Sequence, residues 1–359
     1  MSARMSSVGA GMKGGKIAAS DVCRHIPDGA NVFLQQGPSE PQLLRRALCD
    51  AGTASRFRLL TVPVAGINNC EFAQDSCAFG TPPLAFIGAP KLADGIQAGR
   101  VGYVPGHWSQ IVPTILRRFP PDVAVVQVSP PDAEGYCNLG VSASIEFDLL
   151  NAAGLIIAEV NRRVPRVAGD TRIHTDRIAY YAESDYDLLV SRPLTPGAVE
   201  LEIARNVSRV VAAGSTLQVG IGSIPDAVVK ELASAGKIAA FHSGILTDAM
   251  MDAADTWSEP DLLTAGMILG SKALYSRVND ASRLSLRSFR HTHSPAVLAS
   301  IERFVAVNSA IEVDLLGQVN AESLNGRQVG GIGGQADFFR GARGSAHGAA
   351  IVALPSTAN

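Results

Sequence analysis

The sequence is poor in the features that mark membrane, secreted and nucleic-acid-binding proteins. Its 359 residues carry a formal net charge of -2, so neither nucleic acid nor an anionic membrane is expected as a main partner. No apolar run approaches the roughly 18 residues that a membrane helix needs, and residues 1–16 are too polar for a signal peptide. The five cysteines form no CxxC pair, which favours reduced thiols in a cytoplasmic protein: Cys23, Cys49, Cys70, Cys77 and Cys137.

Several catalytic signatures are also absent. The chain has no GxxxxGK[S/T] phosphate loop, no GxSxG nucleophile turn and no HExxH zinc motif. His291 and His293 lie close together, but no further ligands follow at a suitable spacing, so we interpret them as surface residues. The sequence therefore predicts no metal site.

The chain repeats itself at an offset of about 185 residues. Residues 29–37 and 214–222 each combine a turn glycine, a short apolar strand and a second glycine, followed by a helix that opens near a proline. Further along, the apolar strands 123–128 and 304–307 each lead to a Gly-x-x-Asn segment. Several matches in the same order indicate a duplicated unit.

We therefore predict an α/β fold with two similar domains, each a largely parallel sheet flanked by helices. The length of the chain suits two domains, and continuous apolar strands such as 123–128 and 155–160 are typical of parallel sheets covered on both faces. The proline-rich stretch 191–197, ahead of a helix predicted over 199–211, suggests domains at 1–192 and 193–359.

Two glycine-rich loops are the candidate ligand contacts. In 220–224, glycines after a strand let a ligand approach the backbone closely, and free N–H groups at a helix start bind anions. In 330–337, four glycines in five positions offer N–H donors to an oxyanion or a carbonyl. The alternatives are a plain strand-to-helix turn for the first loop and a bulge or tight turn for the second. Asp337 would then cap the following helix.

The stretch from His242 to Asp248 reads His-Ser-Gly-Ile-Leu-Thr-Asp and completes the pattern. Together with the loop 220–227, the Pro-Pro-Asp and Gly-Tyr-Cys-Asn segments of the first half, and the Gly-Gly-Gln-Ala-Asp and Leu-Pro-Ser-Thr segments of the second, it resembles the acetyl-CoA hydrolase/transferase family. Within that family, which has the class I CoA-transferase fold, the chain resembles 4-hydroxybutyrate CoA-transferases. Their motif usually has glutamate, which forms a thioester with coenzyme A, where this chain has Gly244.

The resemblance implies a CoA-linked function. It implies that coenzyme A or acyl-CoA is the substrate, with a small carboxylic acid as its partner, and that the protein forms a homodimer or pairs with a CoA-transferase subunit. Because family members continue past the Leu-Pro-Ser-Thr segment, it also implies a second domain that is C-terminally short. It assigns CoA contacts to Gly220, Ile221, Gly222, Ser223, Ile224, Gly330 and Gly334.

Three functional interpretations of Gly244 stay open. The chain is an acyl-CoA enzyme with water as nucleophile, or a transferase with a carboxylate relocated to Asp248, Glu146 or Glu40, or a CoA-binding homologue or subunit without turnover. His242 and Asp248 are the catalytic candidates that the motif retains. The alternatives are a histidine held by a hydrogen bond and a helix cap.

Overall fold

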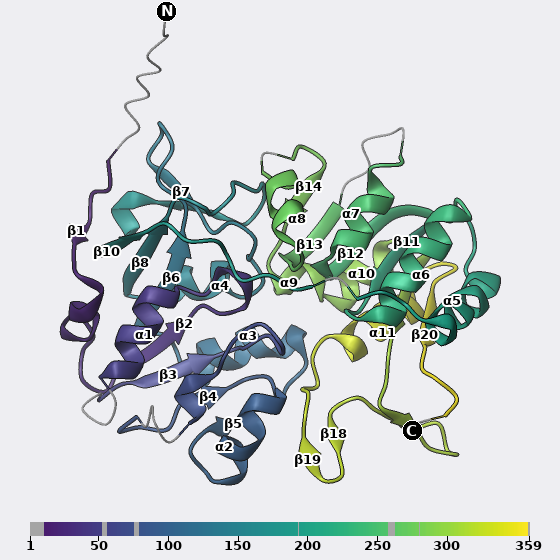
Figure 1. The fold of residues 1–359 in the computed structure, drawn as a ribbon, viewed down its shortest axis with the longest axis horizontal. Coiled ribbons are helices and arrows are strands. Elements are labelled where there is room, and N and C mark those ends of the chain that lie inside the picture. Colours follow the sequence, from purple (N-terminus) through teal and green to yellow (C-terminus); the bar gives the residue numbers. More distant parts are fainter. Residues whose placement is uncertain are drawn as a thin grey trace, which may run out of the picture.

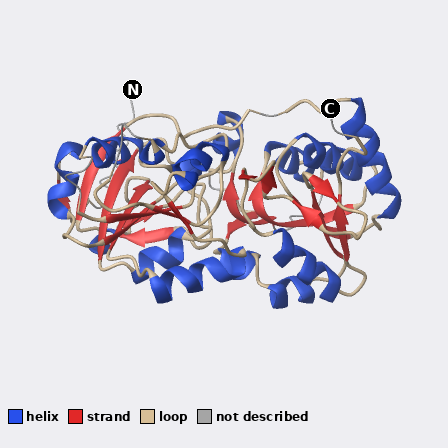
Figure 2. Cartoon of the chain, turned by 90° about the horizontal axis from the view of Figure 1, so that it is seen from below, coloured by secondary structure: helices blue, strands red, loops and turns tan. Residues whose placement is uncertain are grey.

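The computed structural model describes residues 11–51, 56–74, 79–192, 194–257, 263–279 and 281–357. Cys77, one of the five cysteines considered above, and the end of the chain at Asn359 lie outside the described residues. The described chain forms two α/β units that lie side by side (Figure 1), each with strands at its centre and helices on both sides (Figure 2).

The N-terminal unit is built on a sheet of eight strands, and every pair of neighbours in it is parallel. In spatial order the strands are β1 (Gly15–Lys16), β10 (Tyr180–Ser184), β8 (Leu155–Asn161), β6 (Val123–Val128), β2 (Asn31–Leu34), β3 (Arg58–Thr61), β4 (Leu84–Ala85) and β5 (Gly102–Tyr103).

The C-terminal unit has a second parallel sheet, of six strands. Its spatial order is β14 (Leu284–Leu286), β13 (Leu263–Ile268), β12 (Ile238–Leu246), β11 (Ser215–Val219), β15 (Phe304–Asn308) and β20 (Ala349–Val352).

The two sheets share one strand order. Reading β5-β4-β3-β2-β6-β8 against β14-β13-β12-β11-β15-β20 pairs strands that occur in the same sequence order. The repeats 29–37 and 214–222 thus give the equivalent strands β2 and β11, and the echo at 123–128 and 304–307 gives β6 and β15. The predicted fold of two parallel-sheet α/β units is confirmed. Within the described residues the first sheet extends two strands further, through β10 and β1.

Helices cover the faces of both sheets (Figure 2). The described α-helices are α1 (Gln42–Asp50), α2 (Ala93–Gln97), α3 (Trp108–Arg118), α4 (Glu146–Ala152), α5 (Ala198–Val210), α6 (Ser223–Ser234), α7 (Asp248–Ala254), α8 (Lys272–Arg277), α9 (Phe289–Thr292), α10 (Pro295–Ser300) and α11 (Gln335–Gly344). Three antiparallel two-stranded pieces complete the described structure: β7 (Tyr136–Asn138) with β9 (Arg172–His174), β16 (Glu312–Val313) with β17 (Val319–Asn320), and β18 (Ser323–Leu324) with β19 (Arg327–Gln328). None of the helices that the structure describes is both long and apolar enough to cross a bilayer.

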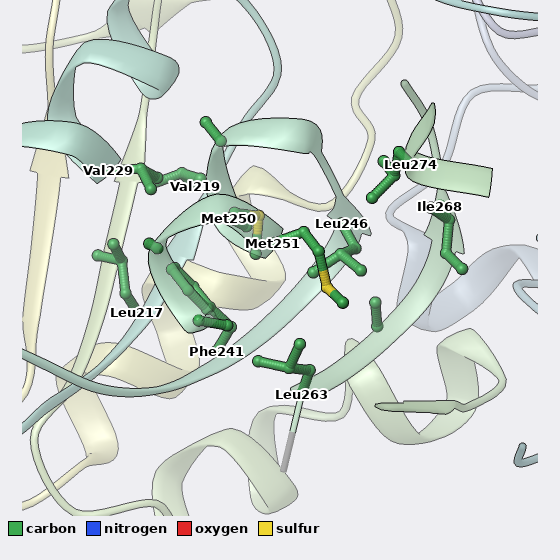
Figure 3. Packing of buried hydrophobic residues seen from close by; sticks show 14 of the residues in the cluster. Leu217, Val219, Val229, Phe241, Leu246, Met250, Met251, Leu263, Ile268 and Leu274 are labelled. Carbon is green, nitrogen blue, oxygen red and sulfur yellow. The ribbon is translucent and has the colours of Figure 1, made fainter. Parts of the chain in front are cut away.

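The core of the C-terminal unit shows why these elements pack. Leu217 and Val219 of β11, Phe241 of β12 and Leu263 of β13 are buried against α6 and α7 (Figure 3). Burying a side chain of this size stabilises the fold by about 1.5–3 kcal/mol. The packing holds β11, β12 and β13 rigidly side by side, and the site described below opens at these strands.

Hydrogen bonds of the backbone and of side chains join the N-terminal and C-terminal units. The N–H of Ala143 donates to the carbonyl of Gly266 (2.9 Å), so a loop of the first unit lies against β13 of the second. Asp337, which would cap its own helix α11 under the alternative interpretation of its loop, accepts hydrogen bonds from the N–H (3.0 Å) and hydroxyl (2.7 Å) of Ser109 at the start of α3. The capping alternative for Asp337 does not hold, because a helix in the other unit presents its unpaired N–H groups there.

The two sheets share no strand, and the chain passes from one to the other between the end of β10 at Ser184 and the start of α5 at Ala198. The expected domain boundary, between residues 192 and 193, falls in this connection. The helix predicted over 199–211 is α5, displaced by one residue at each end.

Candidate active site

A cavity of about 390 Å³ lies where the two units meet. The N-terminal unit contributes apolar side chains such as Phe33 and Trp108, and the C-terminal unit contributes the carboxyl ends of β11 and β12. Carboxyl ends of parallel strands are the usual place for a ligand site in α/β proteins. The cavity is mostly apolar with a small set of polar groups, which is typical of pockets for small molecules.

Gly244, on β12, forms part of the cavity wall. A Cβ atom built there would lie 3.0 Å from Cε1 and 3.1 Å from Nε2 of His293. These distances are shorter than ordinary van der Waals contacts. A side chain at position 244 would therefore compete for space with the imidazole.

His293 is the residue that sequence reasoning missed. It follows α9, and only 2% of its surface is exposed, so interpreting it as a surface residue was wrong. Its ring lies between those of Phe289 (centroids 4.1 Å apart) and Phe338 (4.4 Å). Phe289 precedes it by one helical turn, but Phe338 comes from α11, and nothing in a single sequence shows that the two helices meet.

Burial lowers the pKa of His293 to about 3, so its imidazole is neutral in the physiological range. Its Nδ1 lies 3.0 Å from the hydroxyl oxygen of Thr292, while its Nε2 has no hydrogen-bond partner among the described residues. The neighbouring His291 is half-buried and does not line the cavity.

Glu146 is the carboxylate of the cavity wall. Of the described side chains that line the cavity, only Glu146 and His293 can titrate. One carboxyl oxygen of Glu146 accepts from the hydroxyl of Ser142 (2.8 Å), and the other accepts from the hydroxyl of Ser144 (2.8 Å) and the N–H of Ile145 (3.0 Å). Complete burial raises the pKa of Glu146 above the ordinary range of a glutamate, against the opposing effect of these donors.

The other two candidate carboxylates lie elsewhere. Asp248 begins α7 and accepts hydrogen bonds from the N–H (2.9 Å) and the hydroxyl of Ser271. Glu40 pairs with Arg45 (3.0 Å) and accepts from the side-chain amide of Asn68 (2.8 Å). Neither lines the cavity that contains Gly244, so the structure separates them from Glu146.

His242 is also separated from the cavity. It is buried on β12, and its Nε2 lies 3.2 Å from the carbonyl oxygen of Thr292. Desolvation lowers its pKa to about 4. The hydrogen-bonded histidine, one of the two interpretations above, describes this position.

The residues expected to contact CoA fall into three groups. Gly220, Ile221, Gly330 and Gly334 line the interdomain cavity. Gly222, at the N-terminus of α6, lines a second cavity of about 500 Å³, as do Ile221 and Asp248. Ser223 and Ile224 form the first turn of α6 and line neither of the two cavities.

One further polar pair was not anticipated. Gln218 at the end of β11 and Asn308 at the end of β15 both line the cavity and exchange two hydrogen bonds through their amides (3.2 and 2.8 Å). The described residues contain no cluster of three or more His, Cys, Asp or Glu side chains that could hold a metal ion. The polar side chains among the described residues that line the cavity are Gln36, Ser144, Glu146, Gln218, His293, Asn308 and Gln335.

Comparisons with known proteins agree with this architecture. The chain is 38% identical over 275 residues to the 4-hydroxybutyrate coenzyme A transferase of Clostridium kluyveri, a match that covers 74% of this chain and 64% of that protein. It is 29% identical over 350 residues to the succinyl-CoA:acetate/propanoyl-CoA:succinate CoA transferase of Fasciola hepatica, covering 92% and 71% of the two chains.

The fold also matches a solved structure. RipA from Yersinia pestis superposes with a TM-score of 0.87 at 23% identity, covering 96% of this chain and 82% of that chain. A family model described as the acetyl-CoA hydrolase/transferase N-terminal domain matches residues 15–190, and one described as the acetyl-CoA hydrolase/transferase C-terminal domain matches residues 270–359. With both models matched in order along most of its length, this chain belongs to the acetyl-CoA hydrolase/transferase family.

Proposed function

We propose that the chain binds an acyl-CoA thioester in the interdomain cavity and cleaves it with water, as a hydrolase and not as a ping-pong transferase. The observation that carries this proposal is Gly244, which has no side chain and faces the cavity from β12. In the motif of the family this position is the glutamate nucleophile. A transferase needs a carboxylate there to carry the CoA between two acids.

Two adjoining cavities support CoA as the ligand. The interdomain cavity and the second cavity share Ala65 and Ile221 on their walls, so they lie next to each other. We assign the acyl and thiol end to the interdomain cavity, with Gly220, Gly330 and Gly334 as backbone contacts. The remaining expected contacts, Gly222, Ser223 and Ile224, would bind the rest of CoA near the N-terminus of α6.

Glu146 is the group we assign as general base. Burial raises its pKa above that of an ordinary glutamate, which makes its ionised carboxylate a stronger base. In the reaction, water adds to the thioester carbonyl carbon and gives one proton to Glu146. The C–S bond then breaks, and the proton passes from Glu146 to the sulfur, which releases the carboxylic acid and the CoA thiol.

In a second candidate function the chain is a CoA-transferase, and its nucleophile is Glu146 instead of a residue at position 244. It is favoured by the position of this carboxylate in the same cavity as Gly244. The third interpretation is a CoA-binding homologue or transferase subunit without turnover. Under it, the partner would be a catalytically active chain, whereas the first two are compatible with a homodimer.

Release of CoA thiol from a panel of short acyl-CoA substrates, with and without acetate, tests the proposal. Hydrolysis predicts release without an acceptor acid and no covalent CoA adduct after borohydride treatment. A reduced residue at Glu146 would favour the transferase instead. Binding of CoA without release of thiol or transfer to acetate would favour the non-catalytic homologue.

A further inference from the structure

A neutral imidazole faces the cavity at the place where Gly244 leaves room. The ring of His293 packs against those of Phe289 and Phe338, at centroid distances of 4.1 and 4.4 Å. The edge that carries Nε2 points toward two glycines: a Cβ atom would lie 3.1 Å from Nε2 at Gly244 and 2.4 Å from it at Gly334. Both glycines line the cavity, so this edge borders the space that a ligand would enter.

The hydrogen bond at Nδ1 of His293 indicates which ring nitrogen carries the proton. Thr292 is fully buried, and His293 Nδ1, 3.0 Å away, is the hydrogen-bond partner of its hydroxyl among the described residues. A buried hydroxyl left without an acceptor for its proton would cost about 1–3 kcal/mol. If the hydroxyl donates to Nδ1, that cost is avoided and the single ring proton sits on Nε2, facing the cavity.

From this arrangement we propose that His293 is the residue that polarises the thioester carbonyl, through a hydrogen bond from Nε2–H to the carbonyl oxygen. The inference rests on the proposed acyl-CoA chemistry and adds to it the group that stabilises the oxyanion. No bond to His293 forms or breaks: the N–H donates to the oxygen as negative charge develops on it, and the proton stays on the ring.

The surroundings of His293 favour a role as hydrogen-bond donor over a role as general base. Burial against two phenyl rings disfavours the imidazolium form and lowers the pKa of His293, so the ring is a weak base. A neutral imidazole is suited to donating a hydrogen bond, as in other enzymes that use it as an electrophile. Glu146, which lines the same cavity, provides a separate group for the proton.

The position of the His293 ring also explains why residues 244 and 334 are glycines. A methyl group at Gly334 would overlap the ring atoms Cδ2 and Nε2, both 2.4 Å away, and the flanking phenyl rings restrict how far the imidazole can move. Gly334 is thus required by the close approach of the ring, in addition to any contact with CoA.

The test compares three variants of the full chain with acetyl-CoA as the probe. His293→Ala removes the donor, His293→Phe keeps an aromatic ring without N–H, and His293→Gln replaces the donor with an amide. We expect kcat to fall by about 10²–10³ in the Ala and Phe variants with KM little changed, as for loss of an oxyanion donor, and to recover partly in the Gln variant. His291→Ala is the matched control: it lies on α9, two residues before His293 and outside the cavity, and should turn over like the wild type.

Infrared difference spectra provide a readout independent of turnover. With ¹³C-carbonyl acetyl-CoA bound to the Glu146→Gln variant, the carbonyl stretch should lie at lower frequency when His293 is present than in the Glu146→Gln/His293→Phe double variant. Equal frequencies, or wild-type kcat in both the Ala and the Phe variants, would overturn the role of His293 while hydrolysis itself stands. A wild-type protein that releases no thiol refutes the proposed hydrolysis alone, and the frequency comparison then still decides the inference.

Discussion

Introducing a carboxylate by Gly244→Glu is expected to fail on its own, and the structure gives the reason. The new Cβ would lie 3.0 Å from Cε1 and 3.1 Å from Nε2 of His293, so the imidazole would have to shift to admit any side chain at position 244. Overpacking of this kind costs about 1–3 kcal/mol. The single variant should be destabilised by that amount and should form no adduct with CoA.

Removing the ring should release the obstruction. In the double variant Gly244→Glu/His293→Ala, the glutamate gains the volume of the imidazole and can face the cavity. We expect the two substitutions to be coupled by about 0.5–3 kcal/mol in a double-mutant cycle, in the direction that makes the double variant more stable than the sum of the singles. The double variant should then show acetate-dependent CoA transfer and a borohydride-reducible adduct at position 244.

Urea unfolding followed by tryptophan fluorescence measures the coupling. Trp108 is a local probe because its ring lies 4.9 Å from that of Phe289, beside His293, while Trp257 stacks on Phe241 in the C-terminal core. The reasoning is refuted if Gly244→Glu is as stable as the wild type and the coupling energy is zero. The proposed loss of the nucleophile is refuted if the wild type already transfers CoA to acetate in ping-pong fashion and Gly244→Glu leaves that rate unchanged.

Three more predictions follow from the same geometry. Gly334→Ala should lower the free energy of unfolding by about 1–3 kcal/mol and reduce turnover, because its methyl group displaces the ring of His293; unchanged unfolding and turnover would show that the ring can move freely. If Glu146 is the base, wild-type activity should rise with pH through its raised pKa, since only the ionised carboxylate accepts the proton, and Glu146→Gln should remove that rise; a pH profile that survives in the variant contradicts the assignment. Asp337→Ala should cost about 1–3 kcal/mol in urea unfolding because the N–H and hydroxyl of Ser109 lose their acceptor, and a Ser109→Ala background should reduce that cost; equal costs in both backgrounds would argue against this contact.

The repeated α/β architecture was predictable because it depends on local patterns. A turn glycine, a continuous apolar run and a proline near a helix start specify β2 and β11 without reference to the rest of the chain. The motif around Gly244 and the glycine loops are likewise contiguous in sequence. The loop residues Gly220, Gly330 and Gly334 were therefore expected to lie near a ligand, and they do line one cavity.

What could not be predicted is which separate segments meet. Among the candidate carboxylates, Glu146 reaches the cavity only because its loop lies against β13 of the other unit, whereas Asp248, four residues from Gly244, faces a different cavity.

The sequence by itself thus determined the two parallel sheets, the family motif and the glycine at position 244 within it, because each follows from short-range patterns of residues. Only the tertiary structure decided that His293 belongs to the site. Its burial depends on Phe338, which lies far along the chain on α11, and on the two glycines whose missing side chains leave room for the ring. Long-range packing of this kind leaves no periodic trace in a single sequence, so the imidazole that faces the cavity could be identified only once the helices were in place.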